Sequence, residues 1–331
     1  MEESIESTMQ VAAPRLAIVV PCYNEQEVFA TTLRRLVGLL DEMRERGLVM
    51  AGSRIVFVDD GSRDTTWRLI EESVATYPGR VAGVRLGHNA GHQNALLAGL
   101  SSVVDVSDAA VSIDADLQDD PLAIIRMVEL YRSGYDVVYG VRRSRTTDTW
   151  FKRNTALAFY RTMERMGVES VYNHADFRLM SARAVRELLR YKESGIFLRG
   201  IVPRIGFRQA RVEYDRTARE AGESKYPLRK MINFAVDGIT SFSVRPVRMV
   251  FWLGMVFMAI AFCIFVYTMV RYFSHATIEG WTSLMISIWF CTGIVLLALG
   301  IIGEYVGKIF MEVKERPRFT IDTVIGVESE E

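Results

Sequence analysis

Cysteine, net charge and glycine-rich nucleotide motifs are scarce or absent in this sequence. Its 331 residues include three cysteines, Cys22, Cys263 and Cys291, which lie far apart and form no CxxC pair. This argues against a disulfide framework or a zinc site and suits a reducing compartment. The formal net charge is zero, so no basic field favours a nucleic-acid partner. No P-loop or GxGxxG motif occurs, which argues against an NTPase or a dinucleotide-dependent dehydrogenase.

Apolar residues, by contrast, are abundant and concentrated toward the C-terminal end. Hydrophobic residues make up 50% of the chain, and residues 247–270 and 284–303 form two long runs with almost no charge. At ~1.5 Å per helical residue, each run can cross a hydrocarbon core of about 30 Å. We therefore expect a two-helix transmembrane hairpin within 246–307, with helices at about 247–270 and 284–306. The alternative is a pair of buried helices in a soluble core, which seldom contains uncharged stretches this long.

The distribution of basic residues sets the expected orientation of this hairpin. Arginine and lysine residues flank its start and follow its end, whereas the short connection between the helices carries little charge. The positive-inside rule then places both long ends of the chain in the cytoplasm, as in a multi-pass membrane protein. Residues 1–14 are acidic and have no apolar core, so we expect a disordered tail rather than a signal peptide.

Residues 223–245 carry an amphipathic pattern directly before the hairpin. Apolar residues recur there at helical spacing beside Lys225, Arg229 and Lys230. The pattern predicts juxtamembrane helices that lie in the lipid surface, with basic groups toward the lipid phosphates. An ordinary helix packed on the soluble domain is the alternative.

Residues 15–222 alternate between strand-like and helix-like periods. Runs rich in β-branched residues end in polar groups at RLAIVVP, RIVFVDD, VAGVRLG, AAVSIDAD and YDVVYGVR, and helix-like segments separate them at 25–46, 65–77, 92–104 and 121–133. This order predicts an α/β domain with a mainly parallel sheet and helices on both faces. Ligands of such sheets bind beyond the carboxyl ends of the strands.

The polar motifs of the domain follow those strand ends. PCYNE, DDGSRD, HNAG and DADLQDD come after the first four strands, so they should meet on one edge of the sheet. A turn in DADLQ would let the oxygens of Asp116 and Gln118 face the same Mg²⁺ or Mn²⁺ ion. The acidic loop is alternatively just solvated. For His88 and His92, which flank NAG, we favour local hydrogen bonds or a phosphate contact over metal binding.

The ordered set of motifs resembles one known family. VVPCYNE, VDDGSRDTT, HNAGHQNALLAGL, SIDADLQDDP, ADFRLMS and AGESKYPLRKMI occur in sequence before the expected hairpin. They are similar to the motifs of the bacterial polyprenyl-phosphate glycosyltransferases, which are inverting family 2 enzymes of the GT-A (Rossmann-like) fold related to dolichyl-phosphate mannose synthase. The resemblance covers roughly residues 16–307.

This resemblance implies a donor site for a UDP-sugar. By motif position, Pro21, Tyr23 and Glu25 contact the nucleoside, and Asp59 contacts the base or ribose. Asp114 lies near the ribose or the sugar.

The resemblance also implies a metal site and a phosphate site. Asp116 and Gln118 coordinate Mg²⁺ or Mn²⁺, and Asp116 counts with Asp114 as a catalytic residue. Arg178, Arg219 and Lys225 are the candidates for binding the donor and acceptor phosphates, because two phosphate-bearing substrates need fixed cations between them. Without the resemblance, Arg219 and Lys225 are ordinary solvated loop charges.

Asp176 in ADFRLMS is the third expected catalytic residue. Related inverting enzymes use an aspartate of this region as a base, but a lipid phosphate has a second pKa near 6 and is largely ionised at neutral pH. We therefore hypothesise that Asp176 orients the acceptor or a nearby cation such as Arg178, or helps to remove the residual proton.

The implied reaction is transfer of a sugar from a UDP-sugar to undecaprenyl phosphate with inversion, for modification of a cell-envelope glycan. The implied partners are the donor, the lipid acceptor, the bilayer and further copies of the chain, with a tetramer as the working number. Residues 308–331 form the expected cytoplasmic tail and could add a strand to a neighbouring protomer. A processive polysaccharide synthase, which normally has a QxxRW motif, and a non-catalytic sensor of nucleotide sugars are the alternatives.

Overall fold

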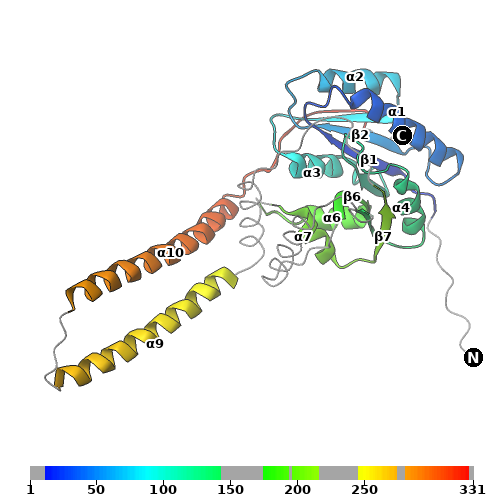
Figure 1. Ribbon diagram of the computed structural model, residues 1–331. Coiled ribbons are helices and arrows are strands. Elements are labelled where there is room, and N and C mark those ends of the chain that lie inside the picture. The colour runs from blue at the N-terminus through cyan, green and yellow to red at the C-terminus, as the bar shows by residue number, and fades with distance from the viewer. Residues whose placement is uncertain (1–11, 143–173, 194–195, 216–244, 274–279, 328–331) are drawn as a thin grey trace, which may run out of the picture. The chain divides into compact units, whose positions relative to one another are not determined.

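A computed structural model describes residues 12–142, 174–193, 196–215, 245–273 and 280–327 (Figure 1). The chain divides into two compact units, described separately below. The first consists of residues 1–156, 170–224 and 317–331, and the second of residues 157–169 and 225–316. Most of the expected N-terminal tail and of the juxtamembrane segment 223–245 lies outside the described residues.

The first unit contains a mixed sheet. Its described residues form eight strands in the order β7-β5-β6-β4-β1-β2-β3-β8. These strands are β1 (Leu16–Cys22), β2 (Arg54–Asp59), β3 (Val81–Leu86), β4 (Ala109–Ser112), β5 (Val137–Arg142), β6 (His174–Ser181), β7 (Gln209–Tyr214) and β8 (Ile321–Ile325). β1 pairs in parallel with β2 and β4, β2 with β3, and β5 with β7. β6 runs antiparallel to β4 and β5, and β8 runs antiparallel to β3. The expected mainly parallel α/β sheet is confirmed.

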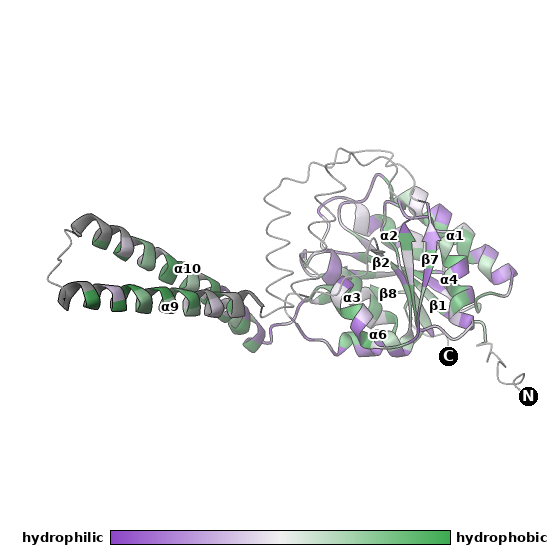
Figure 2. Cartoon of the chain, turned by 60° about the horizontal axis from the view of Figure 1, so that its bottom comes forward, coloured by the Kyte–Doolittle hydropathy of each residue, from purple (hydrophilic) through white to green (hydrophobic). Residues whose placement is uncertain are grey.

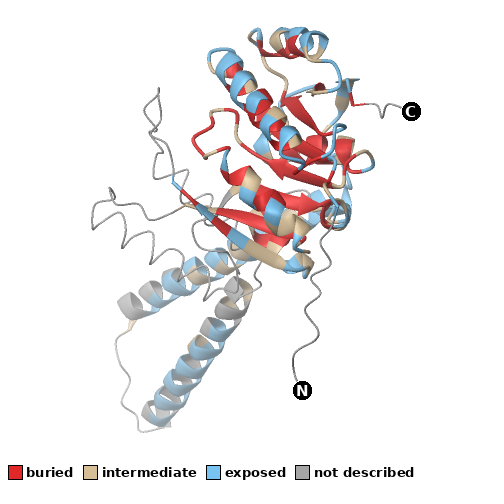
Figure 3. Cartoon of the chain, turned by 90° about the vertical axis from the view of Figure 1, so that its right-hand side faces the viewer, coloured by how far each residue is buried: buried red, intermediate tan, exposed pale blue. Residues whose placement is uncertain are grey.

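Helices cover both faces of this sheet, because its central strands are apolar on both sides. All residues of β1 and β2 are buried, as Figure 3 shows for most of the sheet. The helices are α1 (Phe29–Glu45), α2 (Thr66–Thr76), α3 (His92–Val103), α4 (Ala123–Arg132), α6 (Ala182–Leu189) and α7 (Leu198–Ile201), followed by a 3₁₀ turn at Val202–Ile205. Apolar residues of α1, α2 and α4 form one core with alternate strand residues such as Ile18 and Ile55. α3 and α6 contact the sheet from the other face, the face of Val19 and Val58.

The close approach of α3 to this second face depends on Gly99. A Cβ atom at Gly99 would lie 2.5 Å from a methyl group of Val19 and 2.6 Å from one of Val58. Such distances are far shorter than normal carbon contacts, so a larger residue would push α3 away from the sheet. The glycine therefore sets the distance between α3 and the sheet.

The C-terminal strand β8 completes the sheet at the edge formed by β3. The extended segment was expected from the sequence, but the expected partner was a neighbouring protomer. In the structure β8 pairs with β3 of its own chain, and Arg54 fixes it by donating from Nη1 to the carbonyl oxygens of Gly326 and Val327 at 3.0 and 2.6 Å. The free edge of β3 thus receives a strand from the same chain.

The second unit contains two long helices, α9 (Arg245–Phe273) and α10 (Trp281–Val313). They include the two runs expected to be helical, and α10 continues past the expected end at residue 306. Figure 2 colours most of the described residues of both helices as hydrophobic. Among the described residues, Phe290–Val313 of α10 is long and apolar enough to cross a membrane, with a mean hydropathy of 1.9 and none of it buried. A shorter apolar stretch occupies Gly254–Ile264 of α9.

Candidate active site

The loops that follow β1 and β2 are joined into one rim at the carboxyl edge of the sheet. Asn24 lies in the left-handed region, with φ of 55°, and its backbone N–H donates to Ser62 Oγ at 2.9 Å. The N–H of Arg63 donates in return to Asn24 Oδ1 at 2.8 Å, and that of Glu25 donates to Thr66 Oγ1 at 2.9 Å. Glu25, which was expected to begin a helix, belongs to this loop instead, and α1 begins at Phe29.

Asp60 extends the rim to the loop before α3. Its carboxylate accepts hydrogen bonds from the N–H groups of Ala90 and Gly91 at 2.7 and 3.0 Å. Gly61 allows this contact, because a Cβ atom there would lie 2.7 Å from the backbone of His88 and Asn89. The loops after β1, β2 and β3 therefore form a continuous surface.

The DADLQ segment follows β4 and turns at Leu117. Leu117 has a φ of 44°, and the N–H of Gln118 donates to Asp116 Oδ1 at 3.2 Å. Thr32 of α1 anchors the segment, because its hydroxyl donates a hydrogen bond to the carbonyl oxygen of Ala115 at 2.5 Å. The expected turn between Asp116 and Gln118 is therefore present.

The four carboxylates of this segment have different surroundings. Asp114 and Asp116 are partly exposed on the rim, whereas Asp119 is buried and forms an ion pair of 3.0 Å with Arg142 of β5. Asp120 accepts the N–H of Leu122 at 3.1 Å, directly before α4. The density of acids in the sequence thus combines two rim carboxylates, one buried ion pair and one helix start.

β6 brings Asp176 beside this segment, because it runs antiparallel to β4. Ser112 of β4 is in register with Arg178, and its hydroxyl donates to the carbonyl oxygen of Asp176. The side chains of Asp176 and Arg178 lie on the same face of the strand and form an ion pair of 2.6 Å. Arg178 is 1% exposed, so its guanidinium belongs to the interior rather than to the open rim.

A second arginine, Arg199 of α7, binds the same carboxylate. Its Nη2 donates to Asp176 Oδ2 at 3.1 Å and its Nε to Oδ1 at 3.3 Å. Burial alone would raise the pKa of Asp176, but the charges of Arg178 and Arg199 outweigh burial and hold the pKa well below its usual range. Asp176 is therefore ionised at neutral pH and is a weak base.

His92, the first residue of α3, lies between Asp114, in the loop after β4, and Asp176 of β6. Its Nε2 is 3.5 Å from Asp114 Oδ1 and 4.0 Å from Asp176 Oδ2. Loss of solvent raises the pKa of Asp114, and the neighbouring carboxylates of Asp119, Asp176 and Asp116 raise it further, although His92 acts in the opposite direction. An added cation near Asp114 would relieve this repulsion.

The oxygen groups of the rim suit a divalent cation that is shared with a substrate. Among the described residues, no three His, Cys, Asp or Glu side chains are grouped closely enough to hold a metal ion. Mg²⁺ is commonly bound by one or two carboxylates together with substrate phosphates rather than by a complete protein cage. Asp116 and Gln118, on one turn beside the acidic Asp114, fit a shared site of this kind.

The residues expected at the donor nucleoside differ in accessibility. Tyr23 is exposed at 42% and Glu25 is partly exposed, whereas Pro21 is buried within β1. Asp59 is buried at the end of β2, where burial raises the pKa of its carboxyl and Arg85 lies 4.0 Å away. Tyr23 and Glu25 are thus on the surface of the rim, and Asp59 lies beneath it.

Two predicted site residues, Arg219 and Lys225, lie outside the described residues, and two residues of the rim were not predicted. Arg199 and Asp60 were not predicted, because neither has a local sequence signal for its role. Arg199 is far from Asp176 in the sequence and contacts it only in the folded chain. Asp60 cannot be distinguished by sequence from the other acids of the DDGSRD motif.

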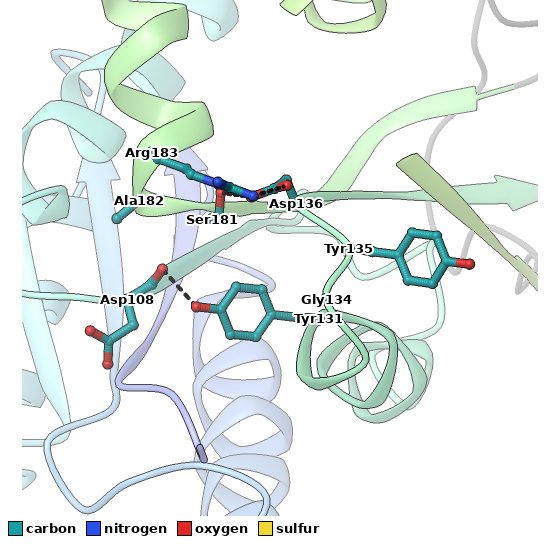
Figure 4. A pocket seen from close by; sticks show the side chains of 8 residues that line it. All are labelled: Asp108, Tyr131, Gly134, Tyr135, Asp136, Ser181, Ala182 and Arg183. Atoms are coloured by element: carbon teal, nitrogen blue, oxygen red, sulfur yellow. Dashed lines mark hydrogen bonds and ion pairs between the residues drawn. The ribbon is translucent and has the colours of Figure 1, made fainter. Parts of the chain in front are cut away.

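A cavity of about 280 Å³ opens at the opposite edge of the sheet, near the amino ends of β4 and β5. Figure 4 shows Ser181 and Arg183 meeting at Asp136, and Tyr131 directed at Asp108. Tyr131 donates to the backbone carbonyl of Asp108, whose carboxylate pairs with Arg15 at 3.2 Å, and the Asp136 carboxylate is bound by Ser181 and Arg183. The cavity is therefore separate from the rim that carries the predicted residues.

Sequence comparison identifies the family. The chain belongs to glycosyltransferase family 2, whose family model matches residues 17–189. The resemblance inferred from the motifs is thereby confirmed.

Individual relatives match over almost the whole chain. An uncharacterized glycosyltransferase of Bacillus subtilis, YkoT, is 52% identical over 315 residues, which cover 95% of this chain and 93% of the relative. The bactoprenol glucosyl transferase of Shigella phage SfX is 35% identical over 312 residues, which cover 93% and 98%. Among solved structures, mannosyl-3-phosphoglycerate synthase from Rubrobacter xylanophilus matches with a TM-score of 0.43 and 16% identity, over 68% of this chain and 73% of that one.

Proposed function

We propose that this glycosyltransferase transfers a sugar from a UDP-sugar to undecaprenyl phosphate, with inversion, at the cytoplasmic face of the bacterial inner membrane. The product is a β-linked polyprenyl-phosphate sugar used to modify a cell-envelope glycan. Relatives named bactoprenol glucosyl transferase that align with nearly the whole chain support a polyprenyl-phosphate acceptor.

The observation that carries this proposal is the meeting of acids and cations around His92. His92 approaches Asp114 of the donor-side loop to 3.5 Å and Asp176 to 4.0 Å, and Asp176 is bound by Arg199. A rim of this kind offers an acidic side for a metal-bound diphosphate and a cationic side for a second phosphate. Two phosphate-bearing substrates thereby approach each other with their charges offset, which is catalysis by proximity.

In this reaction an acceptor phosphate oxygen attacks the anomeric carbon from the face opposite UDP. The bond between that carbon and the diphosphate breaks, and UDP leaves with the electron pair. The acceptor phosphate has a second pKa near 6, so it is largely ionised at neutral pH and requires no strong base. The pKa of Asp176 is held low by Arg178 and Arg199. Asp176 therefore serves to orient these two guanidinium groups rather than to remove a proton.

Asp116 and Gln118 would hold the divalent ion, Mg²⁺ or Mn²⁺. When bound, the ion supplies positive charge to the diphosphate as its negative charge grows. Tyr23 and Glu25 would contact the nucleoside at the exposed part of the rim, with Pro21 and Asp59 shaping the floor beneath it. Asp114 would lie next to the ribose or the sugar.

The membrane part of the proposal concerns the second unit. α9 and α10 would form the transmembrane hairpin, and residues 223–245 would lie in the lipid surface, with both termini in the cytoplasm. Arg219 and Lys225 would bind phosphate near this surface, and the chain would assemble as a homo-oligomer, with a tetramer as the working number.

The proposal is tested by transfer assays with the purified full-length chain in detergent. A panel of UDP-sugars is supplied with undecaprenyl phosphate and either Mg²⁺ or Mn²⁺, and the lipid product is detected by mass spectrometry. Product from at least one donor, lost on chelation of the metal, is the expected result. Folded protein that binds UDP but yields no lipid-linked sugar with any donor would contradict the proposal and favour a sensor of nucleotide sugars.

A further inference from the structure

Arg199 combines an ordered guanidinium with access to solvent. Its two-point contact with Asp176 fixes the plane of the group, yet its side chain is 40% exposed, compared with 1% for Arg178. A guanidinium has five N–H donors, and its planar fork binds carboxylate or phosphate through parallel hydrogen bonds. Of the two arginines on Asp176, Arg199 is the one that a ligand can reach.

Two guanidinium groups contact the single carboxylate of Asp176. The buried Arg178 is already committed to Asp176, and its Nη1 also donates to the carbonyl of Leu198 at 3.5 Å. Arg199 is thus the guanidinium of this pair that solvent reaches, with a side chain that is 40% exposed.

The fold fixes this cation close to the donor-side loop. Leu198, the residue before Arg199, donates its N–H to Gln93 Oε1 of α3 at 3.1 Å. Gln93 follows His92, which contacts both Asp114 and Asp176. Asp176 thus stands between Arg199 and the residues that would surround the sugar.

We propose that Arg199 binds the phosphate of the lipid acceptor, and that Asp176 is a positioning residue that acts through Arg199. This inference rests on the proposed function and assigns its acceptor site. The side chain of Arg199 grips the phosphate, and Asp176 holds the guanidinium in the orientation needed for attack on the sugar.

The test compares Arg199→Ala and Arg199→Lys with wild type in steady-state transfer assays. Arg199→Ala is expected to raise KM for a short-chain polyprenyl phosphate about 10- to 100-fold, as expected for loss of a hydrogen bond to a charged group. KM for the UDP-sugar is expected to stay within about 2-fold, and Arg199→Lys should recover part of the loss because it keeps the charge. Arg186→Ala is the matched control, since Arg186 also pairs with an acid, Asp105, at 3.2 Å.

A binding measurement covers the case in which turnover is too slow to measure. Wild-type protein should bind the short-chain polyprenyl phosphate more tightly than the corresponding polyprenol, and Arg199→Ala should lose most of this difference. The double variant Arg199→Ala/Asp176→Asn should bind no more weakly than Arg199→Ala, because Asp176 acts through Arg199.

Two outcomes overturn the inference in distinguishable ways. Unchanged acceptor affinity in Arg199→Ala, or an equal rise in donor and acceptor KM, would contradict the acceptor role of Arg199 while leaving sugar transfer intact. Absence of any transfer by wild-type protein, with any donor, would contradict the proposed function and the inference together.

Discussion

Arg178 and Asp176 form an ion pair of 2.6 Å on one face of β6, with the arginine fully buried. The two side chains can pair because alternate residues of a strand share a face. β6 runs antiparallel to β4, and Arg178 lies opposite Ser112 in the register of the two strands. This relationship places a fixed negative charge at the point where the acidic rim meets its cations.

Asp176→Asn is predicted to lower the free energy of unfolding by about 3 kcal/mol at neutral pH, because it leaves the buried Arg178 charge without its carboxylate. The folded pKa of Asp176 is depressed, so its stabilisation is fully present above the unfolded pKa of about 3.9 and is lost as pH falls through the folded pKa. The difference between wild type and variant should therefore be constant from about pH 5 to 8 and shrink only below about pH 4. Denaturant unfolding at several pH values measures it.

The same variant tests the role of Asp176 in turnover. We expect reduced transfer throughout pH 5 to 8 with no new titration in that range, because Asp176 works as an ionised positioning group. Wild-type turnover in Asp176→Asn over this range would contradict both an orienting and a proton-transfer role.

Asp116→Asn is predicted to reduce sugar transfer by about 100-fold or more, since it removes a hard oxygen ligand from the proposed metal site. Asp120→Asn is a matched control in the same segment. Asp120 accepts the N–H of Leu122 before α4, and asparagine can accept the same bond. Equal activity losses in both variants would point to a general disturbance of the loop instead of a metal role for Asp116.

Gly99→Ala is predicted to destabilise the sheet domain by about 1–3 kcal/mol, because the new methyl group would overlap Val19 and Val58. Gly38→Ala provides the opposite case. Gly38 lies in α1 with nothing within 4 Å of its Cβ position, so alanine there should stabilise by about 0.5–1 kcal/mol. Thermal unfolding of both variants checks the sign of each effect, and a neutral Gly99→Ala would show that α3 is not held so closely.

Arg54→Leu is predicted to loosen β8 from the sheet and cost about 1–3 kcal/mol, because two carbonyl oxygens lose their charged donor. Limited proteolysis should then cleave the C-terminal segment faster than in wild type. Arg80→Leu removes an exposed ion pair with Asp41, which should contribute at most about 1 kcal/mol. Equal protease sensitivity of the two variants would argue that the hydrogen bonds from Arg54 to Gly326 and Val327 do not hold β8 in the sheet.

The parallel strands and their polar loops could be predicted from the sequence because each β-branched run ends directly in polar residues. β1, β2 and β3 occupy the expected runs. The turn at Leu117 is the one that would let Asp116 and Gln118 face the same ion. These features are local, and the chemistry of a few adjacent residues determines them.

Other features depend on residues far apart in the chain and left no local signal. Arg199 meets Asp176 only because α7 folds against β6, and the pairing of Asp119 with Arg142 requires β5 to lie nearby. The extended form of β8 was predictable, whereas its partner β3 was not, because strand pairing depends on the path of the whole chain.

The most direct test of the central claim is the mass of the products formed from undecaprenyl phosphate labelled with ¹⁸O in its phosphate group. If an acceptor phosphate oxygen attacks the anomeric carbon, the lipid product is a monophosphate-linked sugar that keeps all of the label, and unlabelled UDP is released. A diphosphate-linked sugar with release of UMP would contradict the account, because the acceptor would then have attacked phosphorus instead of carbon.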